Sequence, residues 1–234
     1  MEKIQQITGR NAKRLLVFGL FVLVSVASFG QGRSYIRQQI SEKGECRNVA
    51  ITKTNGDLML YGRNGWAGTG LPSNLSSALN ELNNDRSYID DVQLTEEGSW
   101  VILYGDNGFR WYDIPSSLEK KMREFNNDNE IVTSVTFNDA GDWIIISTKH
   151  YSSSDSRINE WLKEGNDRYG QLWAACVTED AIVAVYADGY KFLGNVPQSL
   201  KNALNETELD VYRLKIAGSS WFFADKNGNY RYSM

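Results

Sequence analysis

Tandem repetition constrains the fold of this chain more than any other sequence feature. Its three prolines, Pro72, Pro115 and Pro197, are separated by 43 and 82 residues, which correspond to one period and two. A proline followed by polar residues and then a leucine predicts the start of a helix. Proline has no amide hydrogen, and the first turn of a helix does not need one for its backbone hydrogen bonds. The sequence therefore predicts five complete units, at about 31–71, 72–114, 115–153, 154–196 and 197–234.

Each predicted unit combines one amphipathic helix with three antiparallel strands. In the second unit, Leu75, Leu79 and Leu82 form one apolar stripe of a helix. Alternating apolar residues then predict two strands, and a tight hairpin leads into a third. The pairs that predict this hairpin are Asn64-Gly65, Asn107-Gly108, Asp188-Gly189 and Asn227-Gly228. We also expect the asparagines at 83–84 and 126–127 to close their helices in the left-handed conformation.

The first and fourth units depart from the proline pattern but still predict a helix. In the third joint, residues 152–155 comprise three serines and Asp155, whose oxygens can cap the helix that follows. Before the first strand, residues 34–43 include Ile36 and Ile40 and precede Gly44. Dividing the chain before each helix therefore leaves no unit incomplete.

These units predict a mainly β protein with helices. We expect the five helix-plus-three-stranded-meander units to form a closed five-bladed ring that is β-propeller-like, because repeated meanders of this length are typical of propellers. Five whole units without a distinct capping unit favour closure, since an open stack must cover its two terminal faces with polar variants. The alternative is an open βββα repeat array.

The repeated residues also carry a resemblance to known proteins. Gly98-Ser99-Trp100 and Gly141-Asp142-Trp143 begin apolar strands, and Asn-Gly turns, an Ile-Pro pair at 114–115 and an amphipathic helix follow. This pattern resembles a group of uncharacterised bacterial exported tandem-repeat proteins, and the resemblance covers residues 31–234. A weaker, purely architectural similarity is to five-bladed lectin propellers, and no sugar-binding motif carries over from them.

The N-terminal residues predict export. Residues 15–29 are mostly apolar and follow Lys3, Arg10, Lys13 and Arg14, which is the charge order of a secretory signal. We expect residues 1–30 to be a signal peptide and residues 31–234 to be a single repeat domain in the periplasm or outside the cell. An uncleaved membrane anchor is the alternative, although an apolar run this short spans a bilayer poorly. No cysteine follows closely enough for lipid attachment, so we expect the protein not to be a lipoprotein.

Charge limits the classes of partner. Residues 31–234 carry 21 Lys and Arg against 28 Asp and Glu. An acidic surface repels phosphate backbones, which argues against nucleic acid as a partner. Anionic membrane surfaces are disfavoured for the same reason, and we expect no membrane span after removal of the signal.

One aromatic side chain per unit recurs just after the predicted hairpin turn. These residues are Trp66, Phe109, Tyr151, Tyr190 and Tyr230. On one face of a ring they could stack on sugars or grip an extended peptide, with Asn64, Asn107 and Asn227 supplying hydrogen bonds. The alternative is packing between units, which the shared strand face of Phe109 and Trp111 favours. We expect Trp100, Trp143 and Trp221 to belong to the core.

The sequence predicts no catalytic residue, metal site or cofactor. His150 is the one histidine and lies on a predicted turn, so the nearby serines and Asp155 do not resemble a catalytic triad, whose members normally come from separate elements. The glycines near 62–70 lack the Lys and Ser or Thr of a phosphate-binding loop. Residues 225–229 begin like a calcium loop but lack its closing Glu. Cys46 and Cys176 could form a disulfide or be two buried small side chains.

We therefore expect an exported, non-catalytic binding or scaffold module that recognises a protein or glycan of the cell envelope through one face of the array. Repetition creates a broad surface, which its hairpin turns decorate. One alternative is an exported glycan-active hydrolase that uses a carboxylate pair from different units. Another is a structural subunit of a cell-envelope assembly.

Overall fold

The repeat predicted from the sequence is present in the computed structural model, which describes residues 32–54 and 56–234. Within these described residues, five helices alternate with five separate three-stranded antiparallel sheets. The predicted signal peptide, residues 1–30, lies outside the described residues. The chain is therefore a mixed α/β protein of five repeated units.

The order of elements is the same in every unit. A helix over residues 32–43 precedes β1 (Asn48–Ile51), β2 (Asp57–Tyr61) and β3 (Gly65–Thr69). The second unit has α2 (Ser73–Asn84), β4 (Ile89–Leu94), β5 (Trp100–Tyr104) and β6 (Gly108–Tyr112), and the third has α3 (Ser116–Asn127), β7 (Val132–Phe137), β8 (Trp143–Ser147) and β9 (Tyr151–Ser153). The fourth has α4 (Ser156–Tyr169), β10 (Leu172–Val177), β11 (Ala181–Tyr186) and β12 (Gly189–Gly194), and the fifth has α5 (Gln198–Asn205), β13 (Arg213–Ala217), β14 (Ser220–Ala224) and β15 (Tyr230–Ser233).

Local sequence signals explain where the helices begin. Pro72, Pro115 and Pro197 are the residues immediately before α2, α3 and α5. The fourth helix uses the predicted alternative, because the Asp155 carboxylate accepts a hydrogen bond of 2.6 Å from the amide of Arg157. A side-chain oxygen thus replaces the proline where the repeat has lost it.

The prediction for the helix ends was wrong by a short distance along the chain. The residues with left-handed backbone are Arg86, with φ of 56°, and Asn129, with φ of 55°. The amide of Asp85 still bonds to Glu81 as in a helix, so the chain reverses one residue later, where the amide of Ser87 bonds to the Leu82 carbonyl. This bonding pattern closes the helix whether the left-handed residue is Asn or Arg.

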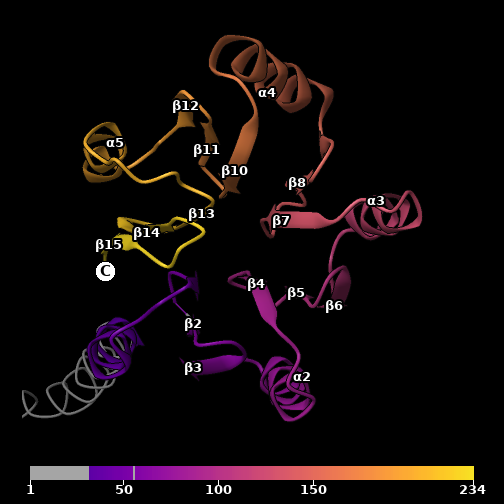
Figure 1. The fold of residues 1–234 in the computed structure, drawn as a ribbon. Coiled ribbons are helices and arrows are strands. Elements are labelled where there is room, and N and C mark those ends of the chain that lie inside the picture. The colour runs from indigo at the N-terminus through magenta and orange to yellow at the C-terminus, as the bar shows by residue number, and fades with distance from the viewer. Residues whose placement is uncertain (1–31, 55) are drawn as a thin grey trace, which may run out of the picture.

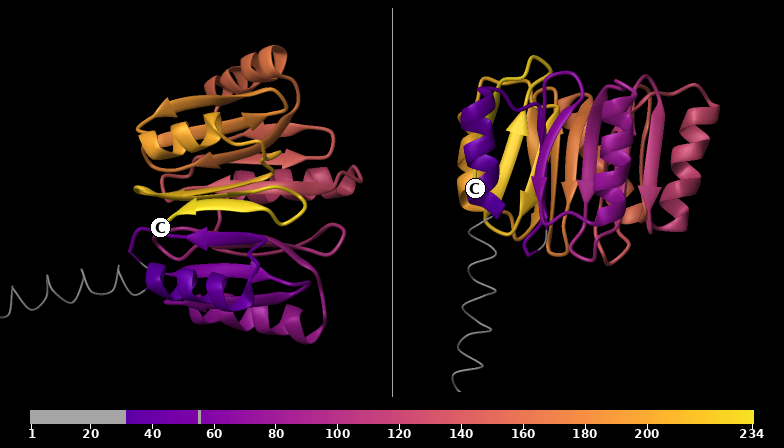
Figure 2. Two further views of the ribbon diagram at one scale, coloured as in Figure 1. Left: turned by 60° about the vertical axis from the view of Figure 1, so that its left-hand side comes forward. Right: turned by 90° about the horizontal axis from the view of Figure 1, so that it is seen from below.

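The five sheets are arranged around a common centre, with the helices at the periphery (Figure 1). The first strand of each unit is innermost, and β1, β4, β7, β10 and β13 contact one another in that order. The last of them, β13, also contacts β1. In side view the sheets stand next to one another with similar strand directions (Figure 2).

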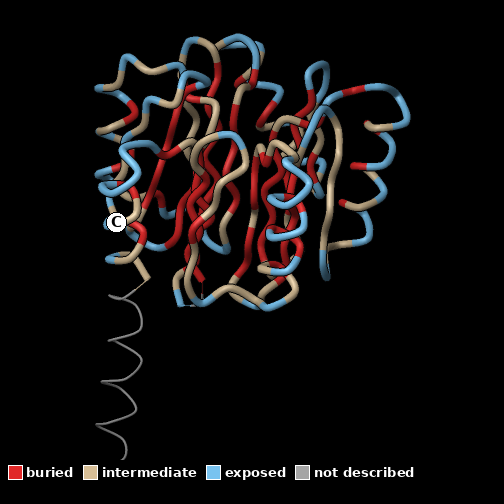
Figure 3. The backbone as a smooth tube through the Cα atoms, turned by 60° about the horizontal axis from the view of Figure 1, so that its bottom comes forward, coloured by how far each residue is buried: buried red, intermediate tan, exposed pale blue. Residues whose placement is uncertain are grey.

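Five apolar clusters lie between units. Four of them join consecutive units, and each of these four includes residues from the helix of the later unit in the pair. The fifth joins the last unit to the first, through Phe222 and Ala224 on one side and Ile36, Ile40 and Met59 on the other. Buried residues accordingly follow the inner strands, whereas the helices expose their outer sides (Figure 3). Every sheet is thus covered by its neighbours.

The recurring tryptophans pack in these clusters, as predicted. Trp100, Trp143 and Trp221 are 4%, 4% and 6% exposed. Each indole N–H donates to the second residue of its own unit's helix: the bonds to Asn74, Ser117 and Ser199 are 3.2, 3.0 and 3.0 Å long. A buried indole needs such an acceptor, and the repeat supplies it at a constant position.

Candidate functional site

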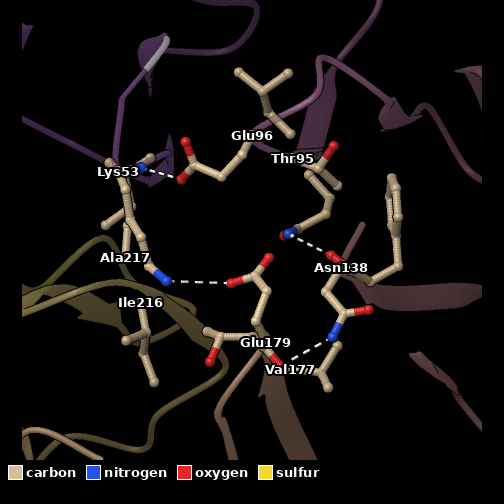
Figure 4. Close-up of a pocket in the computed structure, with 13 residues that line it drawn as sticks. Lys53, Thr95, Glu96, Asn138, Val177, Glu179, Ile216 and Ala217 are labelled. Atoms are coloured by element: carbon tan, nitrogen blue, oxygen red, sulfur yellow. Dashed lines mark hydrogen bonds and ion pairs between the residues drawn. The ribbon is translucent and has the colours of Figure 1, made fainter. Parts of the chain in front are cut away.

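The end of the inner strands that leads into the first hairpin of each unit closes over a small axial pocket. Residues of all five units line it, and its volume is about 30 Å³. Across the opening, the Lys53 ammonium lies 3.3 Å from Glu179, and the backbone amide of Lys53 donates to Glu96 (Figure 4). A space of this size holds about one water molecule, so this end does not accommodate an organic ligand.

A charged network fills the centre of the molecule. The Lys215 ammonium of β13 lies 2.8 Å from the Asp91 carboxylate of β4, and these side chains are 6% and 2% exposed. Asn48 donates to the same carboxylate at 2.7 Å, and Gln93 accepts from Lys215 at 3.2 Å. The fifth and second units are not consecutive in the chain, so this ion pair connects units that face each other across the centre.

A larger cavity lies at the opposite end of the inner strands, where the first, second and fifth units meet. We call it the seam cavity; its volume is about 410 Å³, and it is lined by residues 45–47, 88, 90, 212–213 and 225–228. This volume is within the range of small-molecule sites. Its walls come from the starts of β1, β4 and β13 and from the turn between β14 and β15.

Aromatic rings and cations alternate along the seam cavity. The Arg47 guanidinium lies over the ring of Tyr88, 4.5 Å from its centroid. The Lys226 ammonium lies 3.7 Å from the centroid of the Tyr212 ring, and this ring also stacks on Trp173, with centroids 4.7 Å apart. Such contacts favour a cation next to a ring and hold both in place.

The carboxylates of the seam cavity are engaged by this chain's own donors. Asp90 pairs with Arg213 at 2.7 Å, and Glu45 accepts from the amide of Gly62 at 2.8 Å. Asp225 accepts from the amides of Asn227 and Asn229, both at 2.8 Å. Burial raises the pKa of Asp225, but hydrogen bonds from its own turn outweigh burial and lower that pKa overall. The bonds from its own turn favour the ionised form of Asp225, and all three carboxylates are held in place by donors of this chain.

The five recurring aromatics are not brought together by the structure. Each lies on, or at the start of, the outermost strand of a different sheet, is half-buried, and packs against a different apolar cluster: Trp66, Phe109, Tyr151, Tyr190 and Tyr230. Phe109 also contacts Trp111, with ring centroids 5.4 Å apart. Burial raises the pKa of Tyr151, Tyr190 and Tyr230. Their positions match the packing alternative considered above.

The three asparagines singled out with them have different surroundings. The Asn64 amide donates to the Asn83 carbonyl at 2.8 Å, and the Asn107 side chain accepts from the amide of Val132 at 3.3 Å. Both therefore tie a hairpin turn to a neighbouring segment. Asn227 lines the seam cavity. Of the eight residues proposed for binding, it alone contributes to this cavity.

The histidine and cysteines occupy structural positions. His150 Nδ1 lies 2.6 Å from Glu130, whose other carboxylate oxygen accepts from the Ser147 hydroxyl. Ser147 and His150 thus both bind Glu130, so they do not form the serine–histidine pair of a triad. Cys46 and Cys176 are buried, and both thiols are free. They belong to two different apolar clusters, which agrees with their description as small buried side chains.

Sequence reasoning missed most of the seam cavity, namely Arg47, Tyr88, Tyr212, Arg213 and Lys226. A weak signal was present, because Arg47, Tyr88 and Tyr212 immediately precede inner strands. Their proximity, however, depends on how the fifth unit meets the first two.

No protein-family model matches the chain, and no curated protein is significantly similar to it. Within residues 32–54 and 56–234, no helix is long and apolar enough to cross a membrane. In the same part of the chain, no group of three His, Cys, Asp or Glu side chains is placed to hold a metal ion.

Proposed function

We propose that this protein is an exported, non-catalytic binding or scaffold module that recognises a glycan or protein of the cell envelope through one face of its repeat array. The observation that carries the proposal is the seam cavity, with its volume of about 410 Å³ at one end of the inner strands. Its carboxylates are occupied by the chain's own donors, which favours ligand binding over acid–base hydrolysis. The proposed binding face is therefore the one that carries the seam cavity.

We also propose that the five units form a closed, five-bladed, propeller-like ring, in which a peripheral helix takes the place of the usual fourth strand of each blade. The apolar cluster between the last unit and the first supports closure, and so does the contact between β13 and β1. Deleting residues 197–234 tests this architecture. If the units form a closed ring, the deletion should abolish the cooperative unfolding transition. If they form an open array, the deletion should lower the free energy of unfolding by only one unit's share.

Export is supported by the basic and apolar residues at the N-terminus. Expression of the full chain in a Gram-negative bacterium, followed by fractionation and N-terminal sequencing, tests it. We expect a mature protein that begins at Gln31 in the periplasm or the medium. A full-length chain that stays with the membrane fraction would support the uncleaved anchor instead.

Binding is tested with a panel of glycans and cell-envelope extracts presented to the immobilised protein. Asn227→Trp places a large side chain in the seam cavity from an exposed turn residue. Asp188→Trp is the matched control, because Asp188 is the exposed turn residue at the corresponding position of the fourth unit. We expect selective retention that Asn227→Trp abolishes and Asp188→Trp preserves. Equal retention by both variants would exclude the seam cavity as the binding face.

A further inference from the structure

Among the residues that the structure describes, two cations of the seam cavity have no carboxylate partner. Arg47 donates to the Tyr88 hydroxyl at 2.9 Å and to the Ile89 carbonyl at 2.8 Å, and its other acceptors are also backbone carbonyls. No carboxylate of the described residues pairs with it. Its guanidinium is thus oriented by neutral oxygens, which leave its positive charge uncompensated.

Lys226 is the second such cation. Its ammonium is held over the ring of Tyr212, and in the part of the chain that the structure describes it has no hydrogen-bond acceptor or carboxylate partner. An ammonium carries three N–H donors. Because Lys226 is exposed and also lines the seam cavity, these donors are available to a molecule bound there.

The rest of the lining offers polar and apolar surface in similar amounts. Tyr88 and Tyr212 present rings with hydroxyl groups, Asn227 presents an amide, and the acidic side chains offer acceptor oxygens beyond those already used. The apolar surface includes the rings of Tyr88 and Tyr212, and among the described residues no aliphatic side chain of Val, Leu, Ile or Met lines the cavity. A polyhydroxylated molecule fits such a surface, since its hydroxyls both donate and accept.

We propose that the seam cavity binds an acidic saccharide, with the sugar's carboxylate received by Arg47 and Lys226 and its hydroxyls by the polar wall. This inference rests on the proposed binding function and narrows its ligand to a uronic-acid-type sugar. A charge-assisted pair in a partly enclosed cavity is stronger than one between neutral groups, so the carboxylate dominates selectivity.

The test compares digalacturonate with its neutral counterpart galactobiose by isothermal titration calorimetry at low and moderate salt. We expect digalacturonate to bind at least about tenfold more tightly than galactobiose, and to bind more weakly as salt increases. Lys226→Gln should reduce this affinity about tenfold. Lys201→Gln is the control, because Lys201 lies over the Phe192 ring outside the seam cavity and should leave binding unchanged.

Three results would overturn the inference. One is equal affinity for the acidic and neutral disaccharides, and another is unchanged binding of digalacturonate by Lys226→Gln. The third is binding of a short peptide through its free C-terminal carboxylate, lost on amidation, without binding of digalacturonate. Suppose that the wild type retains envelope glycans, and that Asn227→Trp abolishes this retention, while digalacturonate fails to bind. In that case the acidic-sugar assignment is wrong and the proposed function stands.

Discussion

Replacing Asp91 with asparagine neutralises the carboxylate that faces the buried Lys215 ammonium while keeping an oxygen for the 2.7 Å hydrogen bond from Asn48. At 2.8 Å, opposite charges attract by about 6 kcal/mol for an effective dielectric constant of about 20. Removing one partner of such a buried pair costs about 3–5 kcal/mol, because it leaves the other charge uncompensated. Gln93 remains as an acceptor for Lys215, so we expect about 3 kcal/mol for Asp91→Asn.

The reverse substitution and the double variant complete a thermodynamic cycle. Lys215→Met should cost a similar amount, because the Asp91 carboxylate is then buried without its cation. The double variant should be close to the wild type in stability, since neither charge remains to be compensated. The expected coupling between the two sites is therefore several kcal/mol, which is far above the additivity error of about 0.5 kcal/mol.

Urea unfolding followed by tryptophan fluorescence measures these free energies, and a loss of 3 kcal/mol should lower Tm by about 6–12 °C. The exposed pair Lys163–Asp167 on α4 is the control, with side chains 70% and 60% exposed. Asp167→Asn should cost no more than about 0.5 kcal/mol. Additive effects of Asp91→Asn and Lys215→Met would refute the contact across the centre, and with it the reasoning that the second and fifth units face each other.

Three further predictions concern packing and buried polar groups. Phe222→Ala, at the cluster between the last unit and the first, should cost about 3–5 kcal/mol of unfolding free energy in urea, and a cost below about 1 kcal/mol would contradict closure there. Burial raises the pKa of Cys46 from 9.0 to about 12 and also raises that of Cys176. Both thiols of the native protein should therefore resist a thiol reagent at pH 8 and become reactive on unfolding, and rapid labelling of the native protein would contradict this. The stabilisation that comes from keeping the Cys46 thiol protonated in the folded state should be lost as pH rises from about 9 to about 12. Ser117→Ala removes the acceptor of the 3.0 Å hydrogen bond from the Trp143 indole, so it should cost about 1 kcal/mol in the wild type and much less in a Trp143→Phe background. Equal losses in both backgrounds, measured by urea unfolding, would argue against the bond.

Several elements were predictable because their causes are local. A proline before a helix, an Asn-Gly pair at a hairpin and an apolar stripe at helical spacing act over a few residues, so α2, α3 and α5 begin where the prolines indicate. Asp155 restored the same boundary for α4 through its side chain. The left-handed residue was misplaced because the length of the final helical turn, rather than residue type, determines where the chain reverses.

The aromatic residues illustrate the limit of this reasoning. Their recurrence was visible, and so was the alternation that Phe109 shares with Trp111, but periodicity alone does not separate a packed aromatic from an exposed one. Their half-burial is a consequence of the next unit's helix, which covers the outer strand. Only the relative placement of two units decides it.

By itself, the sequence determined the repeat, its helix and three strands, and the burial of its tryptophans, because each depends on propensities and periodicities within about forty residues. Tertiary structure alone decided the Asp91–Lys215 pair and the seam cavity. Asp91 and Lys215 are more than a hundred positions apart in the chain, and so are the cavity's cations Arg47 and Lys226. These residues approach one another only because the last unit packs against the first. Charges placed once each in different units leave no periodic signal, so their chemistry emerges only when the units are assembled.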